Sequence, residues 1–256
     1  MKKILSPLML AMALASAGTA MAQTAPAAPE SSLSFNVGAV SEYRYRGYSQ
    51  SRFEPAVQGG FDYADKSGAY IGVWGSSIKW IKDGGGNANT EVDIYGGYKF
   101  TVGNVGYDVG FLRYQYSGNA LSPNANTNEL YGAATVGPVT FKYSRSSGNL
   151  FGTSDSKGST YLDMTANFDL GGGYSFTPHL GYQMVKGDEA RTTKLSYADI
   201  ALTLGKDLGN GLSATAAIIG TNAKTGAYYY GPSSNSSAAD KQLGKTGLVV
   251  GIKYAF

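Results

Sequence analysis

The feature that most constrains the fold is an alternation of apolar and polar side chains that repeats along nearly the whole chain. Between residues 33 and 47 the odd positions are mostly apolar, whereas the even positions include Glu42, Arg44 and Arg46. Successive side chains of a β-strand point to opposite faces, so this pattern predicts a strand with apolar surroundings on one face and polar surroundings on the other. We therefore expect an all-β protein.

The alternation recurs in further segments, and the connections between them are short and long in turn. The turns at 65–68 and 136–138 are short, those at 81–90 and 117–127 are long, and only the first outer connection, around 49–54, departs from this rule. Such connections are typical of a bacterial transmembrane antiparallel β-barrel. About twelve strands, an even number, return both termini to one side, which we expect to be the periplasm. The predicted strands cover residues 33–48, 55–65, 69–80, 91–100, 105–116, 128–136, 139–146, 159–168, 174–186, 196–205, 212–220 and 245–256.

The N-terminal residues are expected to be removed during export. Lys2 and Lys3 precede an apolar run over 4–15, and Ala20 and Ala22 place small side chains before a cleavage point ahead of Gln23. This is the arrangement of a signal peptide, and the apolar run is shorter than the ~20 residues that a membrane-spanning helix needs. The expected organisation is a signal peptide over 1–22, a flexible leader over 23–32 and a barrel over 33–256, located in the bacterial outer membrane.

Composition narrows the classes of function. The chain has no Cys, which excludes a disulfide framework and a thiolate metal site. It has no basic cluster that would indicate nucleic-acid binding, and loss of Lys2 and Lys3 lowers the formal net charge from +3 to +1. The chain contains 36 Gly and 20 Tyr, and Gly among aromatic residues is typical of curved barrel strands with aromatics at the membrane interfaces.

The last nine residues alternate to the end of the chain and finish on Tyr254-Ala255-Phe256. This ending resembles the C-terminal signal by which outer-membrane barrels are recognised for insertion. We therefore expect the barrel-insertion machinery and outer-membrane lipid as partners.

A block of motifs in the first part of the barrel carries a resemblance to a known family. Its residues are Ser41-x-Tyr43-x-x-Arg46-Gly47-x-Ser49-Gln50, Pro55-Ala56-x-Gln58-Gly59-Gly60-x-Asp62-Tyr63, Ser67-Gly68-x-Tyr70-x-Gly72-x-Trp74-Gly75-Ser76 and Glu91-x-Asp93-x-Tyr95-Gly96-Gly97-Tyr98. In this block the sequence resembles the TorF-type porins of proteobacterial outer membranes. The resemblance implies a pore.

If the apolar faces contact lipid, the polar faces line the barrel interior. Acidic and basic groups then share one lumen, whose opposed charges would select small polar solutes or, alternatively, fill a narrow barrel with ion pairs. Glu42, Arg44 and Arg46 on the first strand, with Glu91 and Asp93 on the fourth, are the candidates for a constriction. The phase of the third strand leaves open whether Tyr70 and Trp74 face lipid or the pore. The candidate pore-lining residues are Glu42, Arg44, Arg46, Asp62, Glu91, Asp93, Glu129, Lys142, Asp163, His179, Asp199 and Lys253.

An enzyme is the main rival class, because some outer-membrane barrels are phospholipases. The chain has a single His, and the alternation places His179 toward the lumen, away from lipid. The sequence contains no G-x-S-x-G elbow and no H-E-x-x-H motif. We therefore expect no catalysis, no metal and no cofactor. Two hypotheses follow. The first is a passive outer-membrane channel for small polar solutes, and the second is a non-conducting barrel whose outer loops bind a partner. The sequence does not define the oligomeric state.

Overall fold

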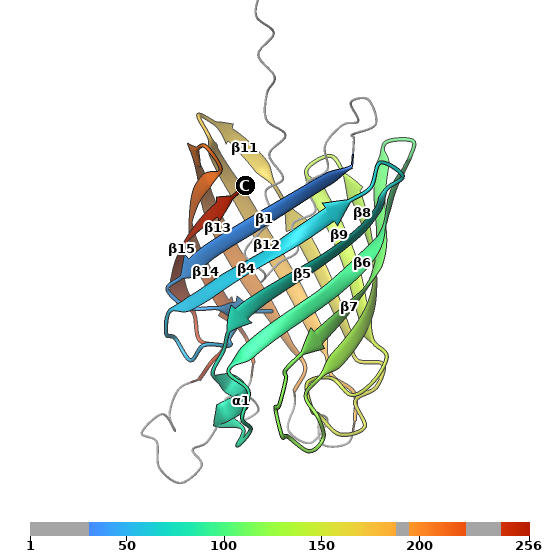
Figure 1. Ribbon diagram of the computed structural model, residues 1–256, viewed down its shortest axis with the longest axis vertical. Coiled ribbons are helices and arrows are strands. Elements are labelled where there is room, and N and C mark those ends of the chain that lie inside the picture. Colours follow the sequence, from blue (N-terminus) through green and yellow to red (C-terminus); the bar gives the residue numbers. More distant parts are fainter. Residues whose placement is uncertain (1–30, 188–194, 224–241) are drawn as a thin grey trace, which may run out of the picture.

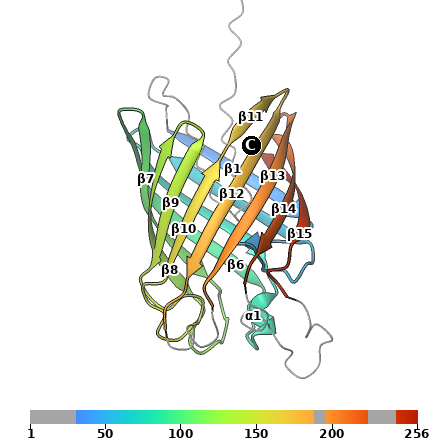
Figure 2. The same cartoon turned by 180° about the vertical axis from the view of Figure 1, so that it is seen from behind.

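The computed structural model describes residues 31–187, 195–223 and 242–256. In this part of the chain the strands form one closed antiparallel barrel of twelve strands (Figures 1 and 2). No helix in the described ranges is long and apolar enough to span a membrane. The elements are β1 (Ser32–Val40), β2 (Arg44–Tyr45), β3 (Tyr48–Ser49), β4 (Ala56–Ala64), β5 (Ala69–Ser77), α1 (Trp80–Asp83), β6 (Thr90–Val102), β7 (Val105–Gln115), β8 (Thr127–Val136), β9 (Val139–Ser146), β10 (Thr160–Ala166), β11 (Phe168–Gly171), β12 (Tyr174–Met184), β13 (Tyr197–Gly209), β14 (Leu212–Thr221) and β15 (Gly247–Ala255).

The wall is a simple meander in which each strand pairs with the next along the chain. It closes between β1 and β15, where Asn36 pairs with Ala255 and Val40 with Gly251. β10 and β11 are one wall strand interrupted at Asn167, since both pair with β12. The small β2–β3 hairpin is the only described strand pair outside the wall.

The two faces of the wall differ as the alternation predicts. The outer face carries exposed apolar side chains on every wall strand, such as Leu33, Leu130 and Leu248, which are 57%, 59% and 65% exposed. The inner face carries buried polar and charged side chains, among them Asp62, Glu129 and Asp199. An apolar exterior around a polar interior is what a barrel in a bilayer requires.

The two ends of the barrel also differ. The short turns lie at one end together with the start of β1 and the end of β15, and α1 lies at the other end with the longer connections (Figure 1). Aromatic rings stack on one another near the turn end, including Phe100 against Tyr107 with centroids 5.2 Å apart and Phe256 against Phe35 with centroids 5.8 Å apart. Such aromatic rings are typical of the membrane–water interface.

Several tyrosines cross the inner wall over a glycine of the neighbouring strand. Gly72 pairs with Tyr95, and Gly110 pairs with Tyr131. A Cβ atom at either glycine would lie 2.5 Å from that tyrosine ring. These glycines therefore provide the space in which lumen-facing aromatic rings lie against the wall, a role that differs from the strand bending predicted from composition.

The predicted strand over 33–48 is wrong at its C-terminal end, because β1 ends at Val40. Residues 41–55 form the connection to β4, so the first outer connection is long like the others. The open question about the third strand is also resolved: Tyr70 and Trp74 both face the lumen, where Tyr70 contacts Asp108 and Trp74 packs against Tyr43. The predicted signal peptide lies outside the described residues.

Candidate functional site: a loop that crosses the barrel lumen

Residues 41–55, here called loop L1, leave the wall after β1 and fold into the barrel. Arg44 pairs with Ser49 and Tyr45 with Tyr48, so the strands β2 and β3 form a hairpin with Arg46 and Gly47 at its turn. Both turn residues have positive φ angles, +46° for Arg46 and +80° for Gly47. Two positive φ angles are the requirement of a type I′ turn, the tight turn whose twist matches that of antiparallel strands.

Arg46 connects the tip of L1 to the far wall of the barrel. Its Nη2 donates to Glu129 Oε2 of β8 at 2.7 Å, and its Nη1 donates to Gln183 Oε1 of β12 at 2.6 Å. The guanidinium also lies over the Tyr161 ring of β10 at 4.2 Å. L1 starts from β1 and β4, which lie across the barrel from β8, β10 and β12 in the strand order. The loop therefore crosses the lumen.

The turn itself is fixed against β13 and β14. Tyr197 donates its hydroxyl to the carbonyl of Arg46 at 3.0 Å. A Cβ atom at Gly47 would lie 2.4 Å from Thr221 Cγ2 and 2.8 Å from Asp199 Cβ. Glycine is thus required at this position both by its positive φ and by the close approach of the wall.

The base of L1 is attached to the near wall and to α1. The Tyr43 hydroxyl donates to Glu91 of β6, whose other oxygen accepts from Tyr116. The backbone N–H groups of Lys79 and Trp80 both donate to the carbonyl of Gln50. Arg52 forms an ion pair with Asp83, and Lys79 with Glu54. Contacts at the base and at the tip together define one position of the loop.

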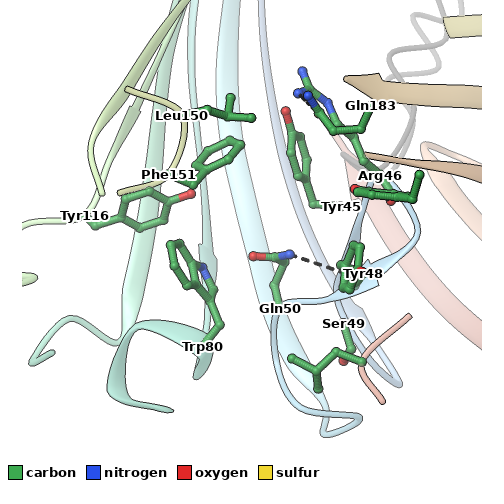
Figure 3. Close-up of a pocket in the computed structure, with 12 residues that line it drawn as sticks. Tyr45, Arg46, Tyr48, Ser49, Gln50, Trp80, Tyr116, Leu150, Phe151 and Gln183 are labelled. Carbon is green, nitrogen blue, oxygen red and sulfur yellow. Dashed lines mark hydrogen bonds between the residues drawn. The ribbon is translucent and has the colours of Figure 1, made fainter. Parts of the chain in front are cut away.

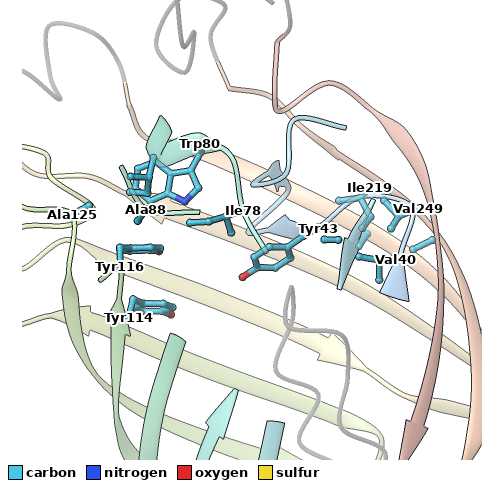
Figure 4. Close-up of a cluster of buried hydrophobic side chains, with 14 residues drawn as sticks. Val40, Tyr43, Ile78, Trp80, Ala88, Tyr114, Tyr116, Ala125, Ile219 and Val249 are labelled. Carbon is cyan, nitrogen blue, oxygen red and sulfur yellow. The ribbon is translucent and has the colours of Figure 1, made fainter. Parts of the chain in front are cut away.

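Aromatic side chains surround the crossing on the side of the long loops. Tyr45, Tyr114 and Phe151 contact one another edge to face, with centroids 5.1–5.7 Å apart. Tyr114 belongs to a buried cluster that extends from Trp80 and Ala125 to Ile219 and Val249 (Figure 4), and Tyr45 and Phe151 pack against this cluster. The cluster places an apolar layer over the polar interior.

A pocket opens between L1 and this layer. Trp80, Tyr116 and Phe151 face Tyr45 and Arg46 across it, and Gln50 lies between them (Figure 3). It contains about 570 Å³ of space between protein atoms, part of it open to solvent. Gln183 lies beside Arg46 at its inner side (Figure 3). The pocket is thus a mainly aromatic vestibule that ends at the Arg46 contact.

The candidate residues of the first strand separate in the structure. Arg46 reaches the far wall, but Arg44 turns toward Glu42 at 2.9 Å and toward the carbonyl oxygens of Gly47 and Lys245. Both guanidinium groups are buried. The prediction that Glu42, Arg44 and Arg46 lie on the first wall strand is wrong, because all three residues belong to L1.

The remaining candidates lie on the inner wall, and many are bound to one another. His179 contacts Asp199 at 2.9 Å, Asp163 at 3.5 Å and the Tyr161 hydroxyl at 3.1 Å, which joins β10, β12 and β13. Lys142 lies 4.0 Å from the centre of the Tyr131 ring. Asp62 accepts a hydrogen bond from Tyr95, and Lys253 is half-buried on β15. The described residues contain no group of three His, Cys, Asp or Glu side chains that could hold a metal ion.

Sequence reasoning missed the aromatic residues that seat L1. Phe151 and Trp80 lie in connections, where the alternation carries no information. The alternation over 33–47 predicts that Tyr45, at an odd position, lies on the lipid face of the first strand, whereas it belongs to L1. One local signal was present, since Arg46-Gly47 between two tyrosines is compatible with a two-residue hairpin turn.

The closed twelve-strand wall and its polar lumen define the fold of an outer-membrane porin. The chain belongs to the family described as "Bacterial protein of unknown function (Gcw_chp)", whose sequence model matches residues 23–256. The TorF resemblance stays an expectation beside this match. No curated protein matches the chain.

Two solved porins share the fold. The KdgM porin in complex with disordered oligogalacturonate has a TM-score of 0.54 and 10% identity, with 87% of this chain and 99% of that chain covered. The NanC porin has a TM-score of 0.53 and 11% identity, with 88% of this chain and 99% of that chain covered. At these identities the similarity concerns the fold alone.

Proposed function

We propose that the protein is a porin-like channel of the bacterial outer membrane that lets small polar solutes diffuse passively. The observation that carries this proposal is the wall itself, which is apolar outside and lined with ionisable groups of both signs inside. A barrel that served only as an anchor has no need of Asp62, Lys142 and Lys253 on its inner face. Opposed charges along a lumen are a means of selecting small hydrophilic solutes.

The orientation and the export route belong to the same proposal. The short turns, the start of β1 and the end of β15 lie at the same end of the barrel, and we assign this end to the periplasm. The C-terminal Tyr254-Ala255-Phe256 is proposed to bind the barrel-insertion machinery, with the signal peptide over 1–22 removed. The oligogalacturonate of the KdgM complex is a ligand of that porin, and the mixed charges of this lumen support the broader class of small polar solutes.

L1 is the constriction of the proposed channel. Arg46 and its partners lie between the vestibule and the rest of the lumen, so a solute that passes along the barrel axis passes this side chain. The contacts of Arg46 with Glu129 and Gln183 are therefore expected to limit the conductance.

Planar-bilayer recording of the purified, refolded protein tests the proposal. We expect discrete conductance steps from the wild-type protein, and larger steps from Arg46→Ala because the side chain that crosses the lumen is shortened. Arg145→Ala is the matched control, since Arg145 is exposed on the outer face of β9 and should leave the step size unchanged. Absence of steps from all three proteins across a range of salt concentrations would refute the channel.

The same recording separates the second candidate function, a non-conducting barrel whose outer loops bind a partner. That alternative is favoured by the contacts of L1 with both walls and by the aromatic layer above it. It predicts that neither wild-type nor Arg46→Ala protein conducts, although both are folded as judged by heat-modifiable migration on a gel.

A further inference from the structure

Three carboxylates gather at the level where L1 crosses the lumen, and one oxygen of the third, Asp93, has no hydrogen-bond partner among the described residues. Glu91 accepts hydrogen bonds from Tyr43 and Tyr116, and Glu129 pairs with Arg46. Asp93 is only 7% exposed, and its Oδ1 atom is buried with no hydrogen-bond partner in the described part of the chain. It also lies within the repulsive field of the Glu91 and Glu129 carboxylates. In the described part of the chain this carboxyl oxygen therefore lies in an unfavourable position until a proton or a cation joins it.

The side chains beside Asp93 are aromatic. Asp93 pairs across the sheet with Trp74 of β5 and with Tyr114 of β7, so the three side chains are neighbours on the inner face. Tyr43 of L1 lies edge to face on Trp74 at 5.4 Å, and Tyr45 on Tyr114 at 5.4 Å. Aromatic faces attract cations, and a buried carboxylate without a partner is unfavourable until a positive group joins it.

We propose that Asp93 is a binding point for a monovalent cation, above all for the ammonium or guanidinium group of a permeating solute. The inference rests on the proposed channel function and names the charge class of its solutes. A divalent metal is a poorer match, because the described residues offer no group of three metal-ligating side chains. The combination of a carboxylate with aromatic faces suits an organic cation better than a strongly hydrated ion.

The charges around L1 also favour cations over anions. Arg46 neutralises Glu129, with which it forms its ion pair, while Glu91 is held by neutral hydroxyl groups. Among the described residues, neither Glu91 nor Asp93 forms an ion pair, so both remain open to a cation at the crossing. A cation at the crossing is attracted by Asp93 and Glu91, whereas an anion is repelled by the same carboxylates.

Binding can be measured without any channel activity, because Trp74 lies next to Asp93 and the chain has only 2 Trp residues. In a Trp80→Phe background the fluorescence of Trp74 is followed in detergent during separate titrations with ethylammonium chloride and potassium chloride at constant ionic strength. We expect a saturable change that Asp93→Asn weakens about tenfold or more, the contribution of a hydrogen bond to a charged group. Asp108→Asn is the matched control, because Asp108 is a lumen carboxylate nearer the turn end that accepts from Tyr70.

The titrations show which cation binds and also whether the site exists at all. A response to ethylammonium alone identifies an organic cation site, and a response to both salts identifies a general monovalent cation site. No response, or a response equal in Asp93→Asn and in the parent protein, overturns the proposal even if the barrel conducts.

Reversal potentials in a salt gradient provide the functional half of the test. We expect the wild-type channel to favour potassium over chloride, and Asp93→Asn to lower that preference more than Asp108→Asn does. An unchanged preference in Asp93→Asn contradicts the cation site alone. Absence of any conductance contradicts the channel proposal alone, and leaves the fluorescence titration as the test of the site.

Discussion

Removal of the Arg46 side chain should destabilise the protein far more than removal of an outer arginine. In the ion pair of Arg46 with Glu129 the side chains are 5% and 3% exposed, so solvent screens it little. Arg46→Ala leaves the Glu129 carboxylate with the Tyr114 hydroxyl at 3.3 Å as its remaining hydrogen-bond donor among the described residues. Breaking a buried pair by removing one partner typically costs about 3–5 kcal/mol. The Arg46 guanidinium also lies 4.2 Å from the centre of the Tyr161 ring and 4.8 Å from that of Tyr45, and loss of these two contacts adds about 1 kcal/mol.

A double-mutant cycle assigns this loss to the pair. The free energy of unfolding is measured by urea titration in phospholipid vesicles for Arg46→Ala, Glu129→Gln and the double variant, with Arg145→Ala as the control. We expect the double variant to lose less than the sum of the single losses, with a coupling energy of about 2–3 kcal/mol. A coupling below about 0.5 kcal/mol would refute the reasoning that Glu129 holds L1 across the lumen.

Three further predictions concern L1 and the turns. Gly47→Ala should lower the free energy of unfolding by more than Gly103→Ala, for which we expect a loss of about 1 kcal/mol. Both glycines have positive φ, but only Gly47 is crowded by the wall. Equal losses in urea titrations would contradict the packing of the hairpin turn. Tyr43→Phe removes a donor to Glu91 and should cost about 1–3 kcal/mol, while the exposed Tyr63→Phe should cost little in the same titration. Hydrogen bonds from Ser67, both side chain and backbone, with a further one from Ser31, lower the pKa of Asp65 to about 2. The contribution of Asp65 to the stability of the folded protein is therefore complete above the pKa that Asp65 has in the unfolded chain, and it is lost as the pH falls through about 2. An NMR titration midpoint near the ordinary value for Asp would contradict these hydrogen bonds.

The wall strands could be predicted from the sequence because each lies between two different media. A shift of one residue would turn every apolar side chain of a strand from lipid into the lumen, so the alternation determines both the strand and its facing. The predicted range 139–146 coincides with β9, and 105–116 exceeds β7 by one residue. Asp62, Glu129 and His179 face the lumen for the same reason.

The path of L1 could not be predicted in this way. Residues 41–47 alternate like a wall strand because a hairpin is also extended, and alternation does not tell whether an extended segment joins the wall or enters the lumen. The deciding contacts are distant in the sequence: Arg46 binds Glu129 and Gln183, which are 83 and 137 positions away. No local pattern contains that information, and Phe151, which packs on Tyr45, comes from a connection without any periodicity.

The first motif of the porin resemblance now has a physical explanation, residue by residue. Within Ser41-x-Tyr43-x-x-Arg46-Gly47-x-Ser49-Gln50, Tyr43 binds Glu91, Arg46 binds the far wall, and Gly47 fits against β13 and β14. Ser49 accepts from the backbone of Phe53, and the Gln50 carbonyl accepts two N–H groups at the start of α1. Every named residue after Ser41 thus helps to hold L1 across the lumen, through its side chain or its backbone. The wall strands, in contrast, need only alternation and tolerate many sequences. Specificity in a barrel of this kind should therefore reside in L1 and in the carboxylates that it faces, because these are the positions at which particular residues, rather than a pattern, are required.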